Sequence, residues 1–202
     1  MSGKNKSPKI PEYKILTLGD SSVGKSSLIL RFIDNKFQFD YLATMGIDYK
    51  HKIIELKNGK KVNLRIFDTA GQERFKSISL NFIKNANGIL LLYDITNEST
   101  FNSVNKWIES IKEAANEKIS IILVGNKSDL EEEREVKTKQ GEDKAKFYEI
   151  PFFETSCKDG SNINEAFEAL TEEILKKKEQ IGEIGEKITK EKAQKKKSGG
   201  CC

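Results

Sequence analysis

Residues 19–26 have the types and the spacing that phosphate binding requires. The stretch reads Gly-Asp-Ser-Ser-Val-Gly-Lys-Ser, which fits the pattern G-x-x-x-x-G-K-[ST]. Gly19 and Gly24 let the backbone curl, so that successive N–H groups point inward at phosphate oxygens. Lys25 supplies a positive charge to the β- and γ-phosphates, and the hydroxyl of Ser26 is a ligand for Mg²⁺. The pattern therefore predicts a site for the phosphates of a nucleotide.

The residues on either side of this loop come in the order that such a site needs. Residues 13–18 are predicted to form a short buried strand, and apolar residues recur at helical spacing in residues 26–33. A helix that begins at the loop adds the positive potential of its N-terminus. A chance glycine-rich turn would not require this order of strand, loop and helix. The residues expected to contact the phosphates are Ser21, Ser22, Val23, Gly24, Lys25, Ser26 and Ser27.

A second polar stretch follows the predicted strand that ends at Phe67. It reads Asp-Thr-Ala-Gly-Gln-Glu over residues 68–73. Asp68 suits indirect help to Mg²⁺, because Mg²⁺ keeps several of its waters. The backbone N–H of Gly71 can approach a γ-phosphate, and Gln72 can orient a water for in-line attack. On its own, Asp-x-x-Gly is as often an ordinary turn.

A third stretch, residues 125–129, also follows a predicted strand and reads Gly-Asn-Lys-Ser-Asp. Asp129 can accept hydrogen bonds from both N1–H and N2–H of guanine. Adenine has no such pair of donors, and a desolvated carboxylate facing its acceptors discriminates by a factor on the order of 10⁴ or more. We expect Asn126 to brace the surrounding loops and the stem of Lys127 to lie along the base. A four-residue match of this kind is a weak signal in isolation.

A fourth stretch, Glu-Thr-Ser-Cys-Lys over residues 154–158, follows the last predicted strand. The backbone N–H groups of Ser156, Cys157 and Lys158 are candidates to bind O6 of guanine. A structural turn of small residues explains Ser156 and Cys157 equally well. Four such stretches in order, each just after a strand, fit one guanine-nucleotide pocket far better than chance.

Composition limits what else the chain can be. It has 202 residues, enough for one domain and a tail, with 37% apolar residues, 33% charged residues and a net charge of +4. Residues 176–202 contain nine lysines and four glutamates, so the rest of the chain is close to neutral. A basic tail on a neutral domain argues against nucleic acid as a partner. The sequence shows no secretory signal, membrane-spanning run or disulfide framework, which favours a reducing cytosol.

Predicted strands and helices alternate along the chain. Strands are expected at residues 13–18, 48–56, 62–67, 88–93, 119–124 and 151–153, with a hairpin turn at Asn58-Gly59. Helices are expected at residues 26–33, 76–85 and 142–149, and in two stretches capped by Ser99 and Asn162. Alternation of this kind predicts an α/β fold with a doubly wound, mostly parallel sheet of six strands and one antiparallel edge strand. Ligands of such sheets bind at the carboxyl ends of the strands, which all four polar stretches follow.

The four stretches resemble the motifs of Ras-superfamily small GTPases, over residues 13–178. The resemblance implies the fold of a P-loop NTPase with two switch segments. Thr44 stands where the family's threonine binds Mg²⁺ and senses the γ-phosphate, and Phe37 where an aromatic ring packs across the guanine. Residues 68–82 match the second switch. Expected on this basis are nucleotide contacts from Phe37, Tyr41, Thr44 and Gly71, catalysis by Gln72 and Lys25, and Mg²⁺ binding by Ser26, Thr44 and Asp68.

Within the superfamily the chain resembles Rab proteins. Residues 45–49, Met-Gly-Ile-Asp-Tyr, are similar to the Rab stretch Ile-Gly-(Ile/Val)-Asp-Phe, and residues 68–75 and 92–96 match Rab patterns. The Gly-Ile-Asp form, together with residues 96–98, leans toward Rabs of the secretory pathway.

Several positions depart from the Rab pattern. Phe67 stands where Rabs usually have Trp, on the surface that effectors touch, and residues 82–86 replace the usual Tyr-Tyr-Arg-Gly-Ala. Ser22 stands where many relatives have Gly, and Cys157 where Ala is common. None of these departures removes a nucleotide ligand, although they leave the Rab subtype and its effectors open.

The last two residues resemble the doubly prenylated end of Rab proteins. Cys201 and Cys202 follow two glycines and do not form a C-a-a-X box. Two lipid chains give stable anchoring to a membrane, whereas one chain gives marginal binding. The lysines at residues 195–197 can add about 1 kcal/mol each near anionic lipid, although simple solvation explains them equally well.

We interpret the chain as three segments. Residues 1–12 are a flexible leader, residues 13–178 are the GTP-binding domain, and residues 179–202 are a flexible basic tail. In the tail we expect Gly182 and Gly185 to break the helix.

The resemblance implies a GTP/GDP switch that recruits effectors to membranes in vesicle trafficking. The expected partners are an exchange factor, a GTPase-activating protein, effectors, an escort protein and a GDP-dissociation inhibitor. The expected location is the cytoplasmic face of an intracellular or plasma membrane, in exchange with the cytosol. Hydrolysis is expected to be slow alone, because no large insertion between Ser26 and Thr44 supplies an arginine. The alternatives are another branch (Rho, Ran or Arf), a P-loop kinase or ATPase, and a module that binds nucleotide without effective hydrolysis.

Overall fold

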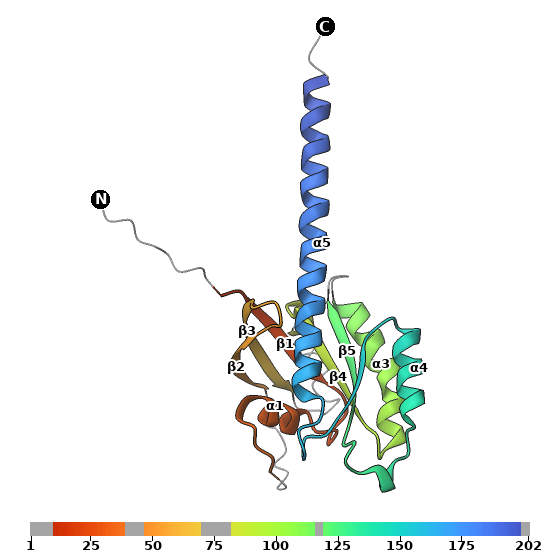
Figure 1. Cartoon of the computed structure of the whole chain (residues 1–202). Helices are drawn as coiled ribbons and strands as arrows, with labels where there is room; N and C mark the ends of the chain where they lie inside the picture. Colours follow the sequence, from red (N-terminus) through yellow and green to blue (C-terminus); the bar gives the residue numbers. More distant parts are fainter. Residues whose placement is uncertain (1–9, 39–46, 70–81, 116–118, 199–202) are drawn as a thin grey trace, which may run out of the picture.

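One mixed sheet forms the centre of the molecule, in a computed structural model that describes residues 10–38, 47–69, 82–115 and 119–198. The strands are β1 (Glu12–Leu18), β2 (Ile47–Glu55), β3 (Lys61–Thr69), β4 (Gly88–Asp94), β5 (Ser120–Asn126) and β6 (Phe152–Thr155). They lie in the order β2-β3-β1-β4-β5-β6 (Figure 1). Among these described strands β2 alone pairs antiparallel, with β3, and it stands at the edge. The predicted six-stranded, mostly parallel α/β sheet with one antiparallel edge strand is confirmed.

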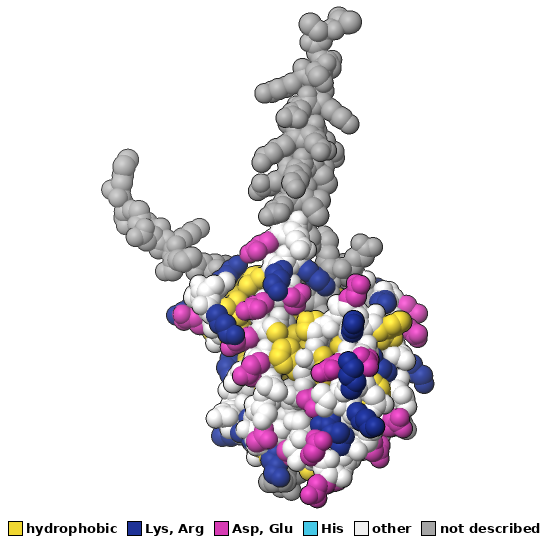
Figure 2. All heavy atoms as spheres, turned by 45° about the vertical axis from the view of Figure 1, so that its right-hand side comes forward, with side chains coloured by type: hydrophobic (Ala, Val, Ile, Leu, Met, Phe, Trp, Pro, Cys, Tyr) yellow, Lys and Arg dark blue, Asp and Glu magenta, His cyan; other side chains and the backbone are white. Residues whose placement is uncertain are grey.

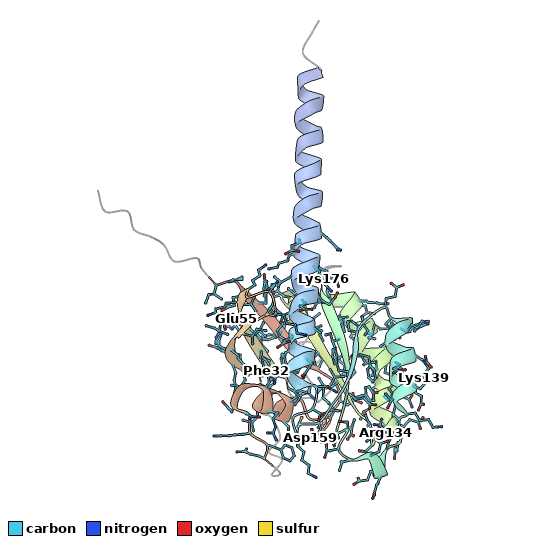
Figure 3. All side chains as sticks on the ribbon, in the orientation of Figure 1. Phe32, Glu55, Arg134, Lys139, Asp159 and Lys176 are labelled. Carbon is cyan, nitrogen blue, oxygen red and sulfur yellow. The ribbon has the colours of Figure 1, made fainter. Side chains whose placement is uncertain are left out.

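Helices cover both faces of this sheet (Figure 1). The described helices are α1 (Lys25–Asp34), α3 (Glu98–Ala114), α4 (Thr138–Phe147) and α5 (Ile163–Ser198), with a short 3-10 turn, η2 (Glu131–Glu133). α1 and α5 pack on one face, where the ring of Phe32, labelled in Figure 3, stacks on Phe167 with centroids 3.7 Å apart. α3 and α4 pack on the other face, where Val104, Ile108 and Ala145 are buried. The sheet therefore lies between two apolar cores.

The strand sequences explain this double burial. In β1, Ile15 belongs to the core beneath α1 and α5, whereas its neighbour Leu16 belongs to the core beneath α3 and α4. All seven residues of β4 are buried, as expected of a parallel strand covered on both faces. The hairpin predicted between β2 and β3 is confirmed: Gly59 adopts a φ of 78°, and its N–H donates to the carbonyl oxygen of Leu56 at 2.8 Å.

The start of α3 corrects a prediction. The helix begins at Glu98, because Asn97 and not Ser99 is its N-cap. The Asn97 side chain accepts a hydrogen bond from the backbone N–H of Ser99 at 3.1 Å and a second from the Ser99 hydroxyl at 2.6 Å. Both residues are good capping types, and the apolar periodicity that follows them does not distinguish one from the other.

The helix predicted at residues 142–149 is α4, with different bounds. It begins at Thr138, because the side chain of Gln140 accepts a hydrogen bond from the backbone N–H of Lys137 at 2.8 Å and so stabilises an earlier first turn. It ends at Phe147, and Glu149 adopts a left-handed conformation with a φ of 55°.

The last helix also corrects a prediction. α5 continues without a break through Gly182 and Gly185 to Ser198 and projects away from the sheet (Figure 1). Glycine costs only about 1 kcal/mol relative to alanine inside a helix, and the segment is otherwise rich in the good helix formers Lys, Glu and Gln. Within the described part of the chain, α5 included, no helix is long and apolar enough to cross a membrane. The division of the chain into leader, domain and tail stays an interpretation.

The surface of the domain mixes both signs of charge. Figure 2 shows Lys and Arg side chains interspersed with Asp and Glu side chains on one face. A binding surface for nucleic acid needs a patch or stripe of positive charge, and the face in this view does not present one.

Candidate guanine-nucleotide site

The loop after β1 has the backbone that phosphate binding needs. Gly24 adopts a φ of 96°, stands at the N-cap of α1, and accepts the hydrogen bond from Leu28 N that opens the helix. A Cβ atom added to Gly24 would lie 2.2 Å from Nδ2 of Asn126. Glycine is therefore required here twice, for the left-handed backbone and for the close approach of a neighbouring loop.

Lys25 lies buried beneath this loop. Its Nζ donates to the carbonyl oxygens of Gly19 at 3.0 Å and Asp20 at 2.6 Å. Burial lowers the pKa of Lys25 to about 8, against the opposing effects of the carboxylates of Asp68 and Asp20. Because burial disfavours the charged ammonium group, a polyanion that enters the loop stabilises it by pairing with its charge.

The residues available for Mg²⁺ are oxygen donors, as that ion requires. Ser26 lies in the first turn of α1, and Asp68, near the end of β3, is close enough to Lys25 to raise the pKa of its ammonium. The described residues contain no group of three His, Cys, Asp or Glu side chains that could hold a metal by itself.

Asn126, the last residue of β5, joins three of the four predicted stretches. Its Nδ2 donates to the carbonyl oxygen of Val23 in the phosphate loop at 2.8 Å. Its Oδ1 accepts hydrogen bonds from the hydroxyl of Thr155 at 3.1 Å and the thiol of Cys157 at 3.4 Å. Burial raises the pKa of that thiol to about 11, so it remains a neutral donor. The bracing role predicted for Asn126 agrees with these contacts.

Asp129 is held by a residue from the fourth stretch. One of its carboxylate oxygens accepts a hydrogen bond from the hydroxyl of Ser156 at 2.7 Å. The same hydroxyl oxygen accepts the backbone N–H groups of Lys158 and Asp159, each at 3.2 Å. Ser156 therefore fixes the direction of the carboxylate that we expect to bind guanine.

Lys127 contacts a different carboxylate. Its Nζ lies 2.5 Å from Oδ2 of Asp94, which ends β4 and is buried. The backbone of Lys127 is left-handed, with a φ of 70°. This ion pair anchors the third stretch to β4.

A cavity of about 600 Å³ lies between these loops, a volume typical of small-ligand sites. Its lining residues are Ser22, Gly24, Ser26, Ser27, Leu30, Phe37, Gln38, Asn126, Lys127, Asp129, Leu130, Cys157 and Lys158. Residues from the first, third and fourth predicted stretches thus meet at one cavity, together with Phe37. Val23, Lys25 and Ser156 are buried behind this lining, and Ser21 is exposed on the loop. Six predicted site residues lie outside the described residues: Tyr41, Thr44, Gly71, Gln72, Cys201 and Cys202. Most of the helix expected at residues 76–85 also lies outside them.

Two arginines outside the sequence motifs bond to residues of the fourth stretch, part of which lines the cavity. Arg134, labelled in Figure 3, makes a two-pronged contact with Glu154, with Nη1–Oε1 at 2.7 Å and Nη2–Oε2 at 2.9 Å. Arg31 on α1 donates to the carbonyl oxygens of Cys157, at 2.7 Å, and Lys158. The contacts of Arg31 span more than a hundred residues, so no local signal in the sequence could have identified them.

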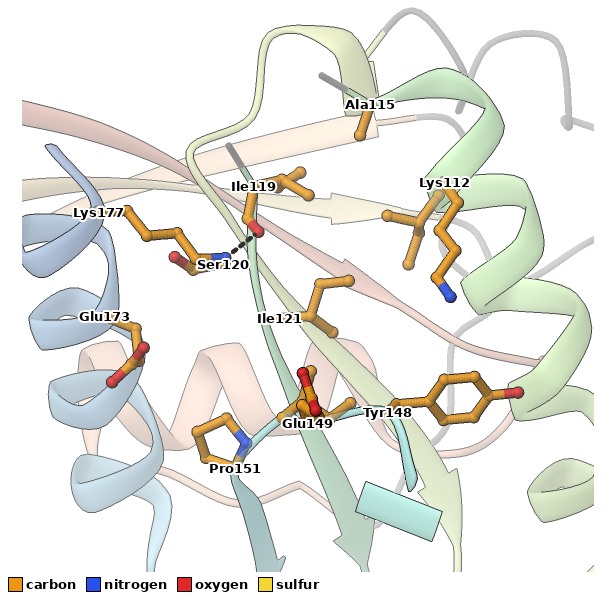
Figure 4. A pocket seen from close by; sticks show the side chains of 12 residues that line it. Lys112, Ala115, Ile119, Ser120, Ile121, Tyr148, Glu149, Pro151, Glu173 and Lys177 are labelled. Carbon is orange, nitrogen blue, oxygen red and sulfur yellow. Dashed lines mark hydrogen bonds between the residues drawn. The ribbon is translucent and has the colours of Figure 1, made fainter. Parts of the chain in front are cut away.

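A second cavity, of about 540 Å³, lies where β5 and β6 begin, at the other end of these strands from the first cavity (Figure 4). Ser120, which begins β5, and Pro151, which precedes β6, both line it. The Nζ atom of Lys177 on α5 reaches into this region and donates to the carbonyl oxygen of Ile119 at 2.6 Å. Because it lies at the amino ends of the strands, this cavity is separate from the nucleotide site.

Comparison with known proteins agrees with this geometry. The model of the Ras family matches residues 14–176. Ras-related protein Rab-10 of Diplobatis ommata is 47% identical over 165 residues, which cover 82% of each chain. Ras-related protein SEC4 of Saccharomyces cerevisiae is 48% identical over 164 residues, 81% of this chain and 75% of the relative. Ras-related protein RABE1e of Arabidopsis thaliana is 42% identical over 200 residues, 94% of this chain and 91% of the relative.

These matches favour none of the alternatives left open by the sequence. Proteins of this family bind GTP and GDP, hydrolyse GTP to GDP, and respond to regulators and effectors. The chain therefore belongs to the Ras family and, within it, is a Rab-family small GTPase of vesicle trafficking.

Proposed function

We propose that GTP or GDP binds across the loops after β1, β3, β5 and β6, with Mg²⁺ held by Ser26, Thr44 and Asp68. The observation that carries the proposal is the network around Asn126, which joins the phosphate loop to the loop of the fourth stretch. The loops around this network carry two groups that match the two ends of a guanine nucleotide: a buried ammonium at Lys25 and an oriented carboxylate at Asp129.

Base selection follows from the carboxylate of Asp129. With one oxygen already bonded to Ser156, the carboxylate faces the base as an acceptor for N1–H and N2–H of guanine. Adenine offers an acceptor at the first position and no donor at the second, so it leaves a buried acceptor unpaired. The ring of Phe37 and the stem of Lys127 line the cavity where the base would stack.

Hydrolysis in this proposal needs few protein groups. Gln72 orients the attacking water in line with the γ-phosphate, and Lys25 stabilises charge on the phosphate oxygens. Bound Mg²⁺ would supply further charge neutralisation at the β- and γ-phosphates. A GTPase-activating protein would supply the missing transition-state charge, worth on the order of 10³–10⁵ in rate.

The switch itself would act through Thr44 and Gly71. Contacts of these residues with the γ-phosphate would order their segments in the GTP form, and hydrolysis would release them. Effectors would bind the ordered form, an exchange factor would open the site, and a GDP-dissociation inhibitor and an escort protein would bind the GDP form.

Membrane attachment would be through prenyl groups on Cys201 and Cys202. Two chains are enough for stable anchoring, and the lysines at residues 195–197 would favour the anionic cytoplasmic face of a membrane. Removal by the GDP-dissociation inhibitor would return the protein to the cytosol.

Single-turnover hydrolysis tests the assignment of Gln72. We expect Gln72→Leu to leave GTP affinity within about twofold of wild type and to slow hydrolysis at least about tenfold, because the attacking water loses its orienting group. Gln180→Leu, the same change at an exposed position on α5, is the matched control and should hydrolyse GTP at the wild-type rate. An unchanged rate in Gln72→Leu would remove that residue from the mechanism.

A further inference from the structure

A helix on the far side of the sheet is bonded directly to the phosphate loop. The indole Nε1 of Trp107 in α3 donates to a carboxylate oxygen of Asp20 at 2.8 Å, across 87 residues of sequence. Both side chains are half-buried. Asp20 follows the first glycine of the loop, and none of the sequence motifs gives its side chain a role.

Asp20 connects this contact to the cation of the site. The backbone carbonyl oxygen of Asp20 accepts a hydrogen bond from Nζ of Lys25 at 2.6 Å, beside the bond from Lys25 to Gly19. One residue is therefore fixed at its side chain by α3 and at its main chain by the phosphate-binding lysine. A rotation of Asp20 would move the carbonyl that positions Lys25.

α3 is a firm support for such a contact. Phe101, Val104 and Ile108 bury its inner face in the core. Lys144 of α4 donates to the carbonyl oxygen of Phe101 at 3.1 Å and lies 3.9 Å from the centre of its ring. The loop is thus tied to an element whose own position does not depend on a nucleotide contact.

The charge of Asp20 makes its direction important. A carboxylate in a phosphate-binding loop repels the phosphates unless it is turned away and hydrogen-bonded. The indole N–H of Trp107 provides that bond on the α3 side of the loop. We infer that Trp107 is a positioning residue for the phosphate loop. By holding the Asp20 carboxylate away from the phosphates, Trp107 slows nucleotide release.

This inference rests on the proposed nucleotide site, and GDP dissociation from the full chain tests it. Trp107→Phe keeps an aromatic ring on α3 and removes the N–H donor. We expect GDP to dissociate about 3- to 10-fold faster, the range for the net contribution of one ordinary hydrogen bond, because both side chains are half-buried. In the Asp20→Asn background the same Trp107→Phe change should alter the rate less than about twofold, because no charge is released toward the phosphates.

The matched control removes a different hydrogen bond from the same helix. Tyr148→Phe deletes the phenol that donates to Asn105 of α3 at 3.1 Å, on the side of α4 and away from the loop. We expect its GDP dissociation rate to equal that of wild type. A similar acceleration in Tyr148→Phe would show that any loosening of α3 speeds release and would overturn the specific role of Trp107.

Fluorescence gives a second measurement that does not depend on rates. The chain has one tryptophan, so intrinsic emission at tryptophan wavelengths belongs to Trp107. Asp20→Asn should shift the emission of the GDP-bound protein, because it replaces the charged partner of the indole, whereas Tyr148→Phe should not.

The outcomes separate the inference from the proposed function. A wild-type chain that retains no GDP overturns the nucleotide site and the inference with it. A wild-type chain that retains GDP, together with equal accelerations by Trp107→Phe in both backgrounds or no acceleration in either, overturns the inference alone.

Discussion

The hydroxyl of Ser156 donates a hydrogen bond to a carboxylate oxygen of Asp129 at 2.7 Å and accepts hydrogen bonds from the backbone N–H groups of Lys158 and Asp159. A fully buried serine thereby sets the direction of the acceptor that we expect to read guanine. Without the bond from Ser156, the side chain of Asp129 would adopt any of several rotamers in its loop. The selectivity of the site is in this sense a property of two loops rather than of one motif.

Ser156→Ala is expected to weaken GDP binding by about 10- to 150-fold, which corresponds to about 1.5–3 kcal/mol for a lost hydrogen bond to a charged group. Equilibrium binding of GDP measures this. Ser110→Ala removes a hydroxyl that bonds within α3, to the carbonyl oxygen of Lys106, and should leave affinity unchanged. Equal affinities of the Ser156→Ala variant and wild type would mean that Asp129 is positioned by other contacts.

Gly24→Ala is expected to abolish nucleotide binding and to destabilise the fold by about 2 kcal/mol or more. The new methyl group would meet Nδ2 of Asn126 at 2.2 Å in a left-handed backbone. Gly59→Ala is the matched control, because Gly59 has a φ of 78° and open space where a Cβ would stand. It should cost about 1 kcal/mol in thermal or denaturant unfolding and leave GDP affinity intact. Similar losses in both variants would assign the effect to backbone strain alone.

Arg134→Ala is expected to destabilise the protein by about 1–3 kcal/mol, because it leaves the partly buried carboxylate of Glu154 without its two-pronged partner. GDP should also dissociate faster, since Glu154 lies two residues before Ser156. Lys139, labelled in Figure 3, forms an exposed ion pair with Asp143 on α4. Lys139→Ala removes this pair and should change neither quantity measurably. Denaturant unfolding and GDP dissociation, measured on both variants, distinguish a bracing role of Arg134 from a merely surface one.

Lys25 is expected to give the nucleotide-free protein a stability that rises with pH. Burial lowers its pKa to about 8 in the folded chain, whereas the unfolded value is about 10.4. Between these values the unfolded state binds more protons, so the free energy of unfolding increases as pH rises. The gain from pH 7.5 to 9.5 should be about 2 kcal/mol larger than in Lys25→Met. A pH dependence shared by both proteins would mean that Lys25 is not desolvated.

The fold could be predicted because its pattern is local. Strands buried on both faces, such as β4, read as short apolar runs, and the Asn-Gly turn marks the hairpin. The errors were at helix ends. Asn97 and Ser99 are equivalent caps in sequence, and the first turn of α4 depends on the side chain of Gln140. Gly182 lowers helix propensity without preventing a helix among strong helix formers.

The site could be predicted in part for a related reason. Lys25, Asn126 and Asp129 occur in short patterns whose spacing the chemistry fixes, so the sequence was enough to find them. The bonds from Arg134 to Glu154 and from Trp107 to Asp20 join residues 20 and 87 positions apart. Only the packing of α3 and the loops brings those pairs together, and no pattern of sequence spacing predicts them.

The central claim, a pocket that reads guanine through Asp129, is tested most directly by the nucleotide that the full chain carries after purification. The bound molecule is released by denaturation and identified by chromatography against standards. We predict GDP or GTP in close to equimolar amount, because the carboxylate fixed by Ser156 selects the N1–H and N2–H donors of guanine. ADP or ATP in their place would contradict the account, since adenine, the base of both, does not offer that pair of donors.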